Sequence, residues 1–368
     1  MKKILTISAV NEKSPALRYR LTYPLRILEK NEEITYDELS FYSVKANSAM
    51  NGTKMLAKII CIIKDLIMFF YKLTTCKEKY DIIIIKNYVF PFGGSKVEKL
   101  IHKKFKASRF IFDIDDGIYL NETRQQNRLF KNLRNACEKV GYWTEACDKV
   151  MLSNEVIYND LNKLFKVNSA KVVQFLSCPY ENQYFRSNDE IEIYKKQNTV
   201  NFIWLGSPHT QENLVKCKEF INELPKIIPN SHVYIIGAHK SFKMFRELNY
   251  VEFVDWNMEN EKKYMQISHI GLNPLIDNKF EQRKSAFKVI QYYRAGIVPI
   301  VSDVGINKNL VATYGGYCTE NFDIDYMSSC IKKILNEYDE ISSKIYMNTI
   351  ELTVEANKEK IKDAIFNQ

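Results

Sequence analysis

Short apolar runs rich in β-branched residues alternate along the chain with longer stretches in which apolar residues recur at helical spacing. This alternation is typical of βαβ units, in which helices cover both faces of a parallel sheet. A first series of expected strands comprises Lys3–Ser8, Ile34–Ser40, Ile82–Ile85, Arg109–Asp113, Lys149–Leu152 and Val172–Phe175. A second series comprises Phe202–Leu205, His232–Ile236, Val251–Val254, Ile270–Leu272, Val298–Val301 and Gly316–Cys318. The pattern predicts an α/β protein with two Rossmann-like halves.

A polar, charged stretch over Arg186–Asn198 separates the two series and is the expected linker. We therefore expect an N-terminal domain over residues 1–190 and a C-terminal domain over residues 191–349, facing each other across a cleft. From about Asn336 onward, sequence rich in Lys and Glu predicts two further helices that are separated near Ser342 or Thr349.

Composition and charge exclude several classes of protein to which the chain could otherwise belong. The net charge of +9 comes from lysines spread over the whole chain, which does not indicate a nucleic-acid-binding arm but suits phosphate-bearing substrates or an anionic membrane surface. The eight cysteines form no Cys-x-x-Cys pair, which argues against a zinc site and a disulfide framework and favours the reducing cytoplasm. The first residues predict a strand and not a signal peptide.

The stretch Ile59–Tyr71 is the most membrane-like part of the sequence, but it falls far short of the ~20 apolar residues of a spanning helix. Lys58, Lys64 and Lys72 lie in or beside it. It predicts either a helix packed on the sheet or a basic amphipathic helix in peripheral contact with an anionic membrane.

The segment His269–Gly305 is the richest in candidate chemistry. It predicts a strand, a loop and then a helix that begins near Lys284 or Ser285 and ends at Gly296. A helix N-terminus after a strand binds anions through backbone N–H groups. Arg283, Lys284 and Lys288 would add positive charge there.

This segment resembles the glycosyltransferase family 4 group of GT-B enzymes, also described as glycosyl transferases group 1. The resemblance lies in Gly271–Leu275, Lys284–Ser302 and Val304–Asn307. Phe202–Thr210 resembles the first strand and turn of that family's nucleotide domain. The resemblance implies that the C-terminal domain binds a nucleotide sugar, that the N-terminal domain binds the acceptor, and that a C-terminal helix over residues 350–368 returns to the N-terminal domain. The donor-binding residues it implies are Gly206, Ser207, Glu281, Arg283, Lys284, Ser285, Phe287, Lys288 and Gln291.

The chain departs from the family at its two-glutamate signature, whose positions hold Arg283 and Gln291. An amide at Gln291 can hydrogen-bond a ribose hydroxyl, but Arg283 cannot accept hydrogen bonds from sugar hydroxyls. Glu281 is the available substitute acid, two residues away.

Three carboxylates, Asp113, Asp115 and Asp116, follow the fourth expected strand. Clustered acids repel one another, so we expect them to serve a base, a metal or a hydroxyl-rich ligand. They resemble an aspartate motif of family-4-like enzymes that lines the acceptor and donor-sugar site. A haloacid-dehalogenase phosphatase motif, the metal-binding Asp-x-Asp of a GT-A transferase and structural capping remain alternatives. Arg18 and Arg20 would reach the donor diphosphate or an anionic acceptor, or lie on a solvated helix face.

The resemblance implies a retaining glycosyltransferase that uses a nucleoside-diphosphate sugar as substrate and needs no metal or cofactor. Its acceptor would be a glycan, a lipid-linked molecule or a polymer, in bacterial surface polysaccharide or glycoconjugate synthesis at the inner face of the membrane. Asp115 or Asp116 would orient hydroxyl groups. The missing glutamate pair keeps a catalytically degenerate binding or scaffold subunit as an alternative, and a nucleotide-sugar epimerase is a weaker one.

Overall fold

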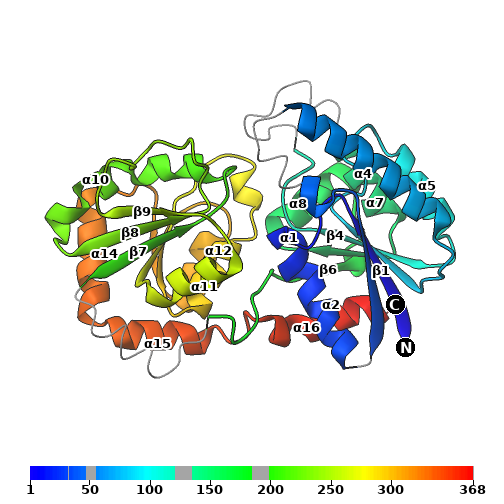
Figure 1. Ribbon diagram of the computed structural model, residues 1–368. Coiled ribbons are helices and arrows are strands. Elements are labelled where there is room, and N and C mark those ends of the chain that lie inside the picture. The colour runs from blue at the N-terminus through cyan, green and yellow to red at the C-terminus, as the bar shows by residue number, and fades with distance from the viewer. Residues whose placement is uncertain (32, 47–54, 121–134, 185–198, 368) are drawn as a thin grey trace. The chain divides into compact units, whose positions relative to one another are not determined.

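The computed structural model describes residues 1–31, 33–46, 55–120, 135–184 and 199–367, which form two units (Figure 1). Unit 1 consists of Met1–Ser177, Arg283–Ser285 and Asn357–Gln368, and unit 2 of Cys178–Gln282 and Ala286–Ala356. The expected linker Arg186–Asn198 lies outside the described residues.

In the part of the chain that the structure describes, unit 1 contains a six-stranded parallel sheet in the order β2-β1-β3-β4-β5-β6. Its elements are β1 (Lys2–Ser8), α1 (Pro15–Leu17), the π-helical turn η1 (Arg18–Thr22), α2 (Tyr23–Lys30), β2 (Ile34–Ser40), α4 (Met55–Thr75), β3 (Ile82–Lys86), α5 (Lys96–Lys104), β4 (Arg109–Ile114), α7 (Ala136–Ala146), β5 (Lys149–Leu152), α8 (Glu155–Phe165), η2 (Ser169–Lys171) and β6 (Val172–Gln174).

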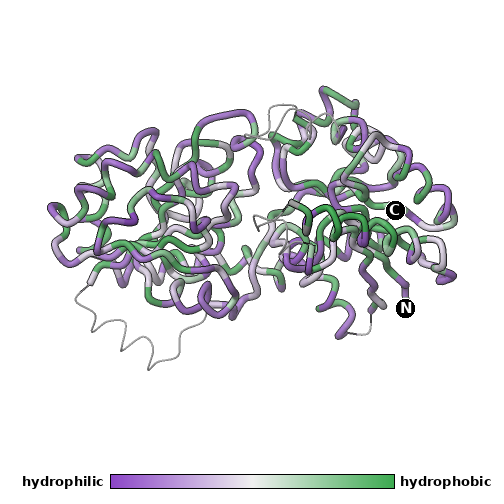
Figure 2. The backbone as a smooth tube through the Cα atoms, turned by 45° about the horizontal axis from the view of Figure 1, so that its top comes forward, coloured by the Kyte–Doolittle hydropathy of each residue, from purple (hydrophilic) through white to green (hydrophobic). Residues whose placement is uncertain are grey.

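The sheet of unit 1 is covered on both faces, because successive side chains of each strand point to opposite sides. Ile83 and Ile85 of β3 enter one apolar cluster together with Phe69 of α4. Ile82 and Ile84 enter another, which α1, η1 and α2 cover. The helix α16 (Val354–Phe366) adds Ile361, Ala364 and Ile365 to this second cluster. Figure 2 shows green, hydrophobic segments running through the interior of each unit.

Unit 2, within its described ranges, also contains a six-stranded parallel sheet, here in the order β12-β11-β10-β7-β8-β9. Read from the other edge, this is the Rossmann order, with β7 and β10 at the centre. Its elements are β7 (Val200–Leu205), η3 (Gln211–Cys217), α10 (Lys218–Ile227), β8 (Ser231–Ile236), β9 (Val251–Val254), α11 (Met258–Ile267), β10 (Ile270–Asn273), η4 (Glu281–Arg283), α12 (Phe287–Arg294), β11 (Val298–Ser302), α13 (Asn307–Tyr314), β12 (Tyr317–Thr319), α14 (Ile324–Asn336) and α15 (Tyr338–Asn348).

Each strand expected from the sequence is present, within one or two residues at either end. The two Rossmann-like halves and the return of the last helix to unit 1 are confirmed. The expected helix break near Thr349 is also confirmed, since α15 ends at Asn348. A break near Ser342 is wrong, because this residue lies inside α15, where its hydroxyl donates to the carbonyl of Gly296. None of the helices in the described ranges is both long and apolar enough to cross a membrane.

Candidate functional site

The carboxyl edge of the sheet in unit 1 carries a row of polar residues. Ser8 and Lys86 end their strands, and Asp113 is the last residue but one of β4. They are register partners, Ser8 with Lys86 and Lys86 with Asp113. The row lies where the strand order reverses, between β1 and β3. In open α/β sheets, ligands bind outside the carboxyl ends of the strands at such a switch point.

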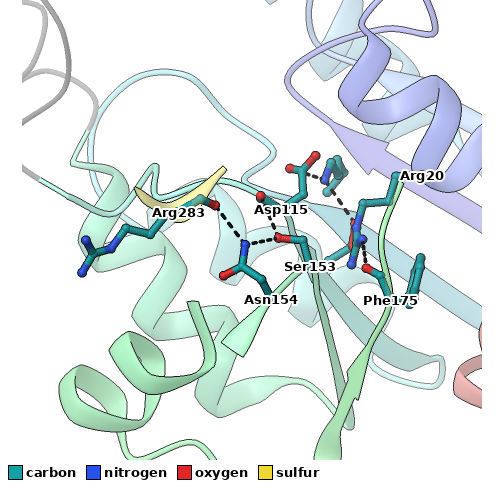
Figure 3. Close-up of polar contacts among 8 residues, drawn as sticks. Arg20, Asp115, Ser153, Asn154, Phe175 and Arg283 are labelled. Carbon is teal, nitrogen blue, oxygen red and sulfur yellow. Dashed lines mark hydrogen bonds and ion pairs between the residues drawn. The ribbon is translucent and has the colours of Figure 1, made fainter. Parts of the chain in front are cut away.

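Two buried cations balance two buried carboxylates at this row (Figure 3). The Lys86 Nζ lies 3.1 Å from an Asp113 oxygen and 2.6 Å from an Asp115 oxygen. The Arg20 Nε donates to both Asp113 oxygens, at 2.5 and 2.7 Å, and its Nη1 donates to the carbonyl of Phe175 at 2.6 Å. The side chains of Arg20, Lys86 and Asp113 have no exposed surface. Each carboxylate therefore has a cation as its partner.

The π-helical turn η1 brings Arg20 into the interior. Pro24 has no N–H group, so it cannot donate to the carbonyl of Arg20 as a regular α-helix requires. The backbone N–H of Tyr23 instead donates to Arg18, five residues earlier. Both Arg18 and Arg20 are buried, so the alternative of a solvated helix face is wrong. Arg20 donates hydrogen bonds to Asp113 and to the carbonyl of Phe175, whereas the sequence predicted a contact with a diphosphate or an acceptor.

The three carboxylates predicted as one catalytic group thus have different environments. Asp113 is fully buried and both its oxygens accept from Arg20, which favours a supporting role. Asp115 is 4% exposed and Asp116 is half-buried at the end of the motif, which makes Asp116 the most accessible of the three. Among the described residues, no group of His, Cys, Asp or Glu has the arrangement of a metal site.

The end of β5 supports this motif. The Ser153 hydroxyl donates to the carbonyl of Asp115 at 2.9 Å. The amide of Asn154 donates to the Ser153 hydroxyl at 3.1 Å and to the carbonyl of Arg283 at 3.2 Å (Figure 3). The same amide lies 3.4 Å from the carbonyl of Lys284. Asn154 thereby holds the short segment Arg283–Ser285, which belongs to unit 1.

Arg283 was expected beside the donor phosphates but forms an ion pair with Asp160 on α8, with nitrogen–oxygen distances of 2.7 and 3.0 Å. Tyr119 donates a further hydrogen bond to Asp160. Burial alone would raise the pKa of Asp160, but the hydrogen bonds from Arg283 and Tyr119 outweigh it and lower the pKa. The pair therefore stays charged at neutral pH.

The loop after β3 is held by two buried residues of opposite charge. A Glu98 carboxylate oxygen accepts from the backbone N–H groups of Val89 and Phe90, both at 3.3 Å. Lys139 donates to the carbonyls of Phe90 and Phe92. Burial raises the pKa of Glu98, whereas the hydrogen bonds lower it. The effect of burial is the larger one, so the pKa is about 7.

This shift predicts that the contribution of Glu98 to stability falls as the pH rises from about 4.5 to about 7. In that range the unfolded chain has lost the Glu98 proton while the folded chain keeps it, so folding takes up a proton and is favoured at low pH. Glu98→Gln should remove a contribution of about 3 kcal/mol from the difference in unfolding free energy between these pH values. Urea titrations across this range measure it, with the exposed Glu145→Gln on α7 as the control. An unchanged pH dependence in Glu98→Gln would contradict the shift.

In unit 2, the switch point lies between β7 and β10, and Gly206 follows β7 directly. A Cβ atom on Gly206 would lie 2.1 Å from the Trp204 ring and 2.8 Å from the Thr210 hydroxyl. Gly206 is thus required by the packing of its own neighbours, whereas the sequence suggested that it makes room for a diphosphate. Gly237, after β8, has a positive φ of +81°, and a Cβ there would lie 2.3 Å from the carbonyl of Gly206.

Lys288 lies at this switch point, on the first turn of α12. Its Nζ is 3.3 Å from the Thr210 hydroxyl and 4.6 Å from the centre of the Trp204 ring. The Thr210 hydroxyl also accepts from the backbone N–H of Ser207 at 3.0 Å, the group that was expected to hold phosphate. The Thr210 hydroxyl and the face of the Trp204 ring thus position the Lys288 ammonium, which can bind an anion.

The helix α12 begins at Phe287 and not at Lys284 or Ser285, so the expected start is wrong by two or three residues. Ala286 has the left-handed conformation, with φ of 51° and ψ of 29°, which an α-helix cannot contain. Lys284 and buried Ser285 therefore precede the helix, whereas half-buried Phe287 and Lys288 start it without a side-chain cap.

The substitutes for the missing glutamates have buried polar partners. Glu281 has no exposed surface and accepts from the amide of Asn213 at 3.3 Å. Gln291 is 2% exposed, and its Nε2 lies 2.6 Å from the Tyr184 hydroxyl and 2.9 Å from the Glu261 carboxylate. The expected ribose contact of Gln291 would have to compete with these two bonds.

Lys86, Tyr184 and Glu261 were not expected from the sequence. The sequence contained a signal that could have indicated Lys86 as a site residue, since this charged residue directly follows the unbroken isoleucine run of β3. Glu261 accepts from Gln291, Tyr184 and the indole of Trp256, the last at 2.6 Å. Its place on the polar helix α11 gave no such signal, because only the fold brings these elements together.

A Rossmann-ordered sheet after a first parallel α/β unit, with the last helix returning to the first unit, defines the GT-B fold of glycosyltransferases, and this chain has that fold. The hypotheses that the aspartate motif is that of a GT-A transferase or of a haloacid-dehalogenase phosphatase are therefore wrong. No protein-family model and no curated protein sequence matches the chain.

Solved structures match over the whole chain. WaaG, a glycosyltransferase involved in lipopolysaccharide biosynthesis, has 12% sequence identity and a TM-score of 0.67, and the alignment covers 100% of both chains. HepE from Anabaena, solved in complex with UDP and glucose, has 11% identity and a TM-score of 0.64 with the same coverage. A glycosyltransferase from Rickettsia africae has 12% identity and a TM-score of 0.64, and covers 100% of this chain and 99% of its own. At these identities the likeness concerns the fold.

Proposed function

We propose that this protein is a glycosyltransferase that moves a sugar from a nucleoside diphosphate to a hydroxyl group of an acceptor. The observation that carries the proposal is the position of Lys288, which places a positive charge at the switch point of a Rossmann-ordered sheet. The same fold in HepE has been solved with UDP-glucose, and in a trehalose-6-phosphate protein of E. coli with UDP-2-fluoro glucose.

In this proposal the diphosphate lies at the start of α12, where the backbone N–H groups of the first turn and the Lys288 ammonium stabilise its negative charge. That charge grows as the bond between the sugar and the diphosphate breaks, so the stabilisation is larger in the transition state. The ammonium supplies what a divalent cation would supply, which supports transfer without a metal. Activity that persists in excess chelator would test this point.

On unit 1, Asp116 is proposed to orient an acceptor or donor-sugar hydroxyl, and Asp115 to support it through the Lys86 pair. The resemblance to family 4 supports retention of the anomeric configuration, which NMR of the product would determine. The acceptor is proposed to be a glycan, a lipid-linked molecule or a polymer in bacterial surface polysaccharide synthesis, at the cytoplasmic face. WaaG, with the same fold, is involved in lipopolysaccharide biosynthesis.

A thermal-shift panel of nucleoside diphosphates and their sugars tests the donor. Binding at a concentration of ~100 times Kd adds about 2.7 kcal/mol of stability, so the matching nucleotide should raise Tm by several degrees. Inorganic phosphate at the same ionic strength is the control. The absence of a shift with every nucleotide would contradict the proposed donor site.

A binding subunit without turnover is the second candidate. Gln291 favours it, because this residue replaces an acid and its amide is hydrogen-bonded to Tyr184 and Glu261. Ser207 also favours it, because its backbone N–H already donates to the Thr210 hydroxyl. A nucleotide that stabilises the protein while no donor sugar is transferred or hydrolysed would support this candidate. Turnover that falls in Asp115→Asn or Asp116→Asn would instead support the transferase.

A further inference from the structure

The helix α4 of unit 1 carries an exposed apolar stripe. Phe69 and Leu73 on its inner face are 1% exposed and pack in the apolar cluster of β3 and β4. Asp65, 5% exposed, accepts from the backbone N–H of Ser43 at 2.8 Å. The helix is thus attached to the unit along one side, and the opposite side consists of large apolar residues.

The stripe has the spacing of one helix face. Leu56, Ile60, Ile63, Ile67 and Tyr71 follow one another at intervals of three or four residues. With the adjoining Ile59 and Met68, their side chains are between 42% and 71% exposed. The stripe is about 22 Å long, at ~1.5 Å per residue. A row of this size marks an interaction surface, whereas single exposed apolar residues do not.

Positive charge lies along one edge of the stripe. Lys64, Met68 and Lys72 follow one another at four-residue spacing, so both ammonium groups lie on the same side. Both lysines are exposed, and neither has an ion-pair partner among the residues that the structure describes. The only acidic residue of α4 is Asp65, which is buried, and the whole chain has a net charge of +9.

We propose that α4 docks this protein on an anionic lipid bilayer, with the helix lying in the plane of the interface. The apolar stripe would enter the boundary between headgroups and acyl chains while Lys64 and Lys72 contact phosphate groups. A lipid surface fits better than an apolar protein groove, because the two exposed ammonium groups beside the stripe are complementary to the phosphate groups of an anionic bilayer. This surface is separate from the residues proposed for sugar transfer, so it stands whether or not that function is correct.

Vesicle flotation with the full chain tests the proposal. The chain should bind vesicles made of equal parts phosphatidylcholine and phosphatidylglycerol, and bind pure phosphatidylcholine at least about tenfold more weakly. Ile60→Asp with Ile67→Asp should abolish binding. Lys64→Glu with Lys72→Glu should weaken binding to the anionic vesicles by about tenfold or more, at ~1 kcal/mol per lysine near the surface.

Matched controls keep the test specific. Leu164→Asp on α8 introduces an acid at an exposed apolar position elsewhere, and Lys332→Glu with Lys333→Glu on α14 reverses two exposed lysines; both variants should leave binding unchanged. The fluorescence of the tryptophan introduced by Ile63→Trp should be quenched by brominated lipid. Such quenching would locate the stripe in the bilayer. Failure of the unaltered chain to bind anionic vesicles would overturn the proposal, as would unchanged binding by the paired aspartate variant. A dimer that this variant dissociates, without vesicle binding, would assign the stripe to a second copy of the chain.

Discussion

Replacing Lys86 with Met is expected to lower the free energy of unfolding by about 3–5 kcal/mol, because two buried carboxylates lose a shared cation. The Lys86 Nζ contacts both Asp113 and Asp115, and its side chain has no exposed surface. Arg20 would still neutralise Asp113, but Asp115 would be left without its cation. Urea-induced unfolding measures the loss.

Lys103→Met on α5 makes the same chemical change at an exposed position and should alter the unfolding free energy by no more than about 0.5 kcal/mol. Adding Asp115→Asn to Lys86→Met should restore part of the stability, since the carboxylate that lost its partner is then neutral. A loss below about 1 kcal/mol in Lys86→Met would show that the cluster is not held together by this charge.

Replacing Lys288 with Met is expected to lower kcat for sugar transfer by a factor on the order of 100 to 1000, while the protein keeps its thermal stability. This expectation depends on the proposed function, in which the Lys288 ammonium stabilises the leaving diphosphate. Its contacts to Thr210 and Trp204 hold it at the carboxyl end of β7. Steady-state rates of nucleotide release with the matching donor measure the effect.

The exposed Lys262 on α11 provides the matched control, and Lys262→Met should leave kcat unchanged. Lys288→Arg should retain more activity than Lys288→Met, because it keeps the positive charge. If Lys288→Met transfers sugar at the original rate, the diphosphate is not stabilised by this residue. If it no longer binds the nucleotide at all, the residue contributes to ground-state binding as well as to the chemical step.

Much of the fold was predictable from the sequence, because strands buried on both faces of a parallel sheet are continuous apolar runs. Ile82–Ile85 and Val298–Val301 are examples, and both are strands in the structure. Gly296, in the left-handed conformation after α12, was also predictable, since it ends a helical pattern and precedes an apolar strand. These features depend on residues close together in sequence.

The start of α12 was less predictable. Nothing in the sequence shows that Ala286 takes a positive φ, because alanine rarely does so. The amide of Asn154, about 130 residues earlier, holds the carbonyls of Arg283 and Lys284 outside the helix. A contact of this range cannot be read from local propensity.

The sequence by itself therefore determined the two parallel α/β units, the carboxylates at the end of β4 and a lysine near the start of α12, since periodicity and composition encode them locally. Only the tertiary structure decided which charges these groups meet. The register of β3 and β4 pairs Lys86 with Asp113, and the π-helical turn brings Arg20 to the same carboxylate. Two aspartates that would repel one another, Asp113 and Asp115, are thereby neutralised beside the half-buried Asp116. Similarly, only the tertiary structure places the Lys288 ammonium over the Trp204 ring and beside the Thr210 hydroxyl.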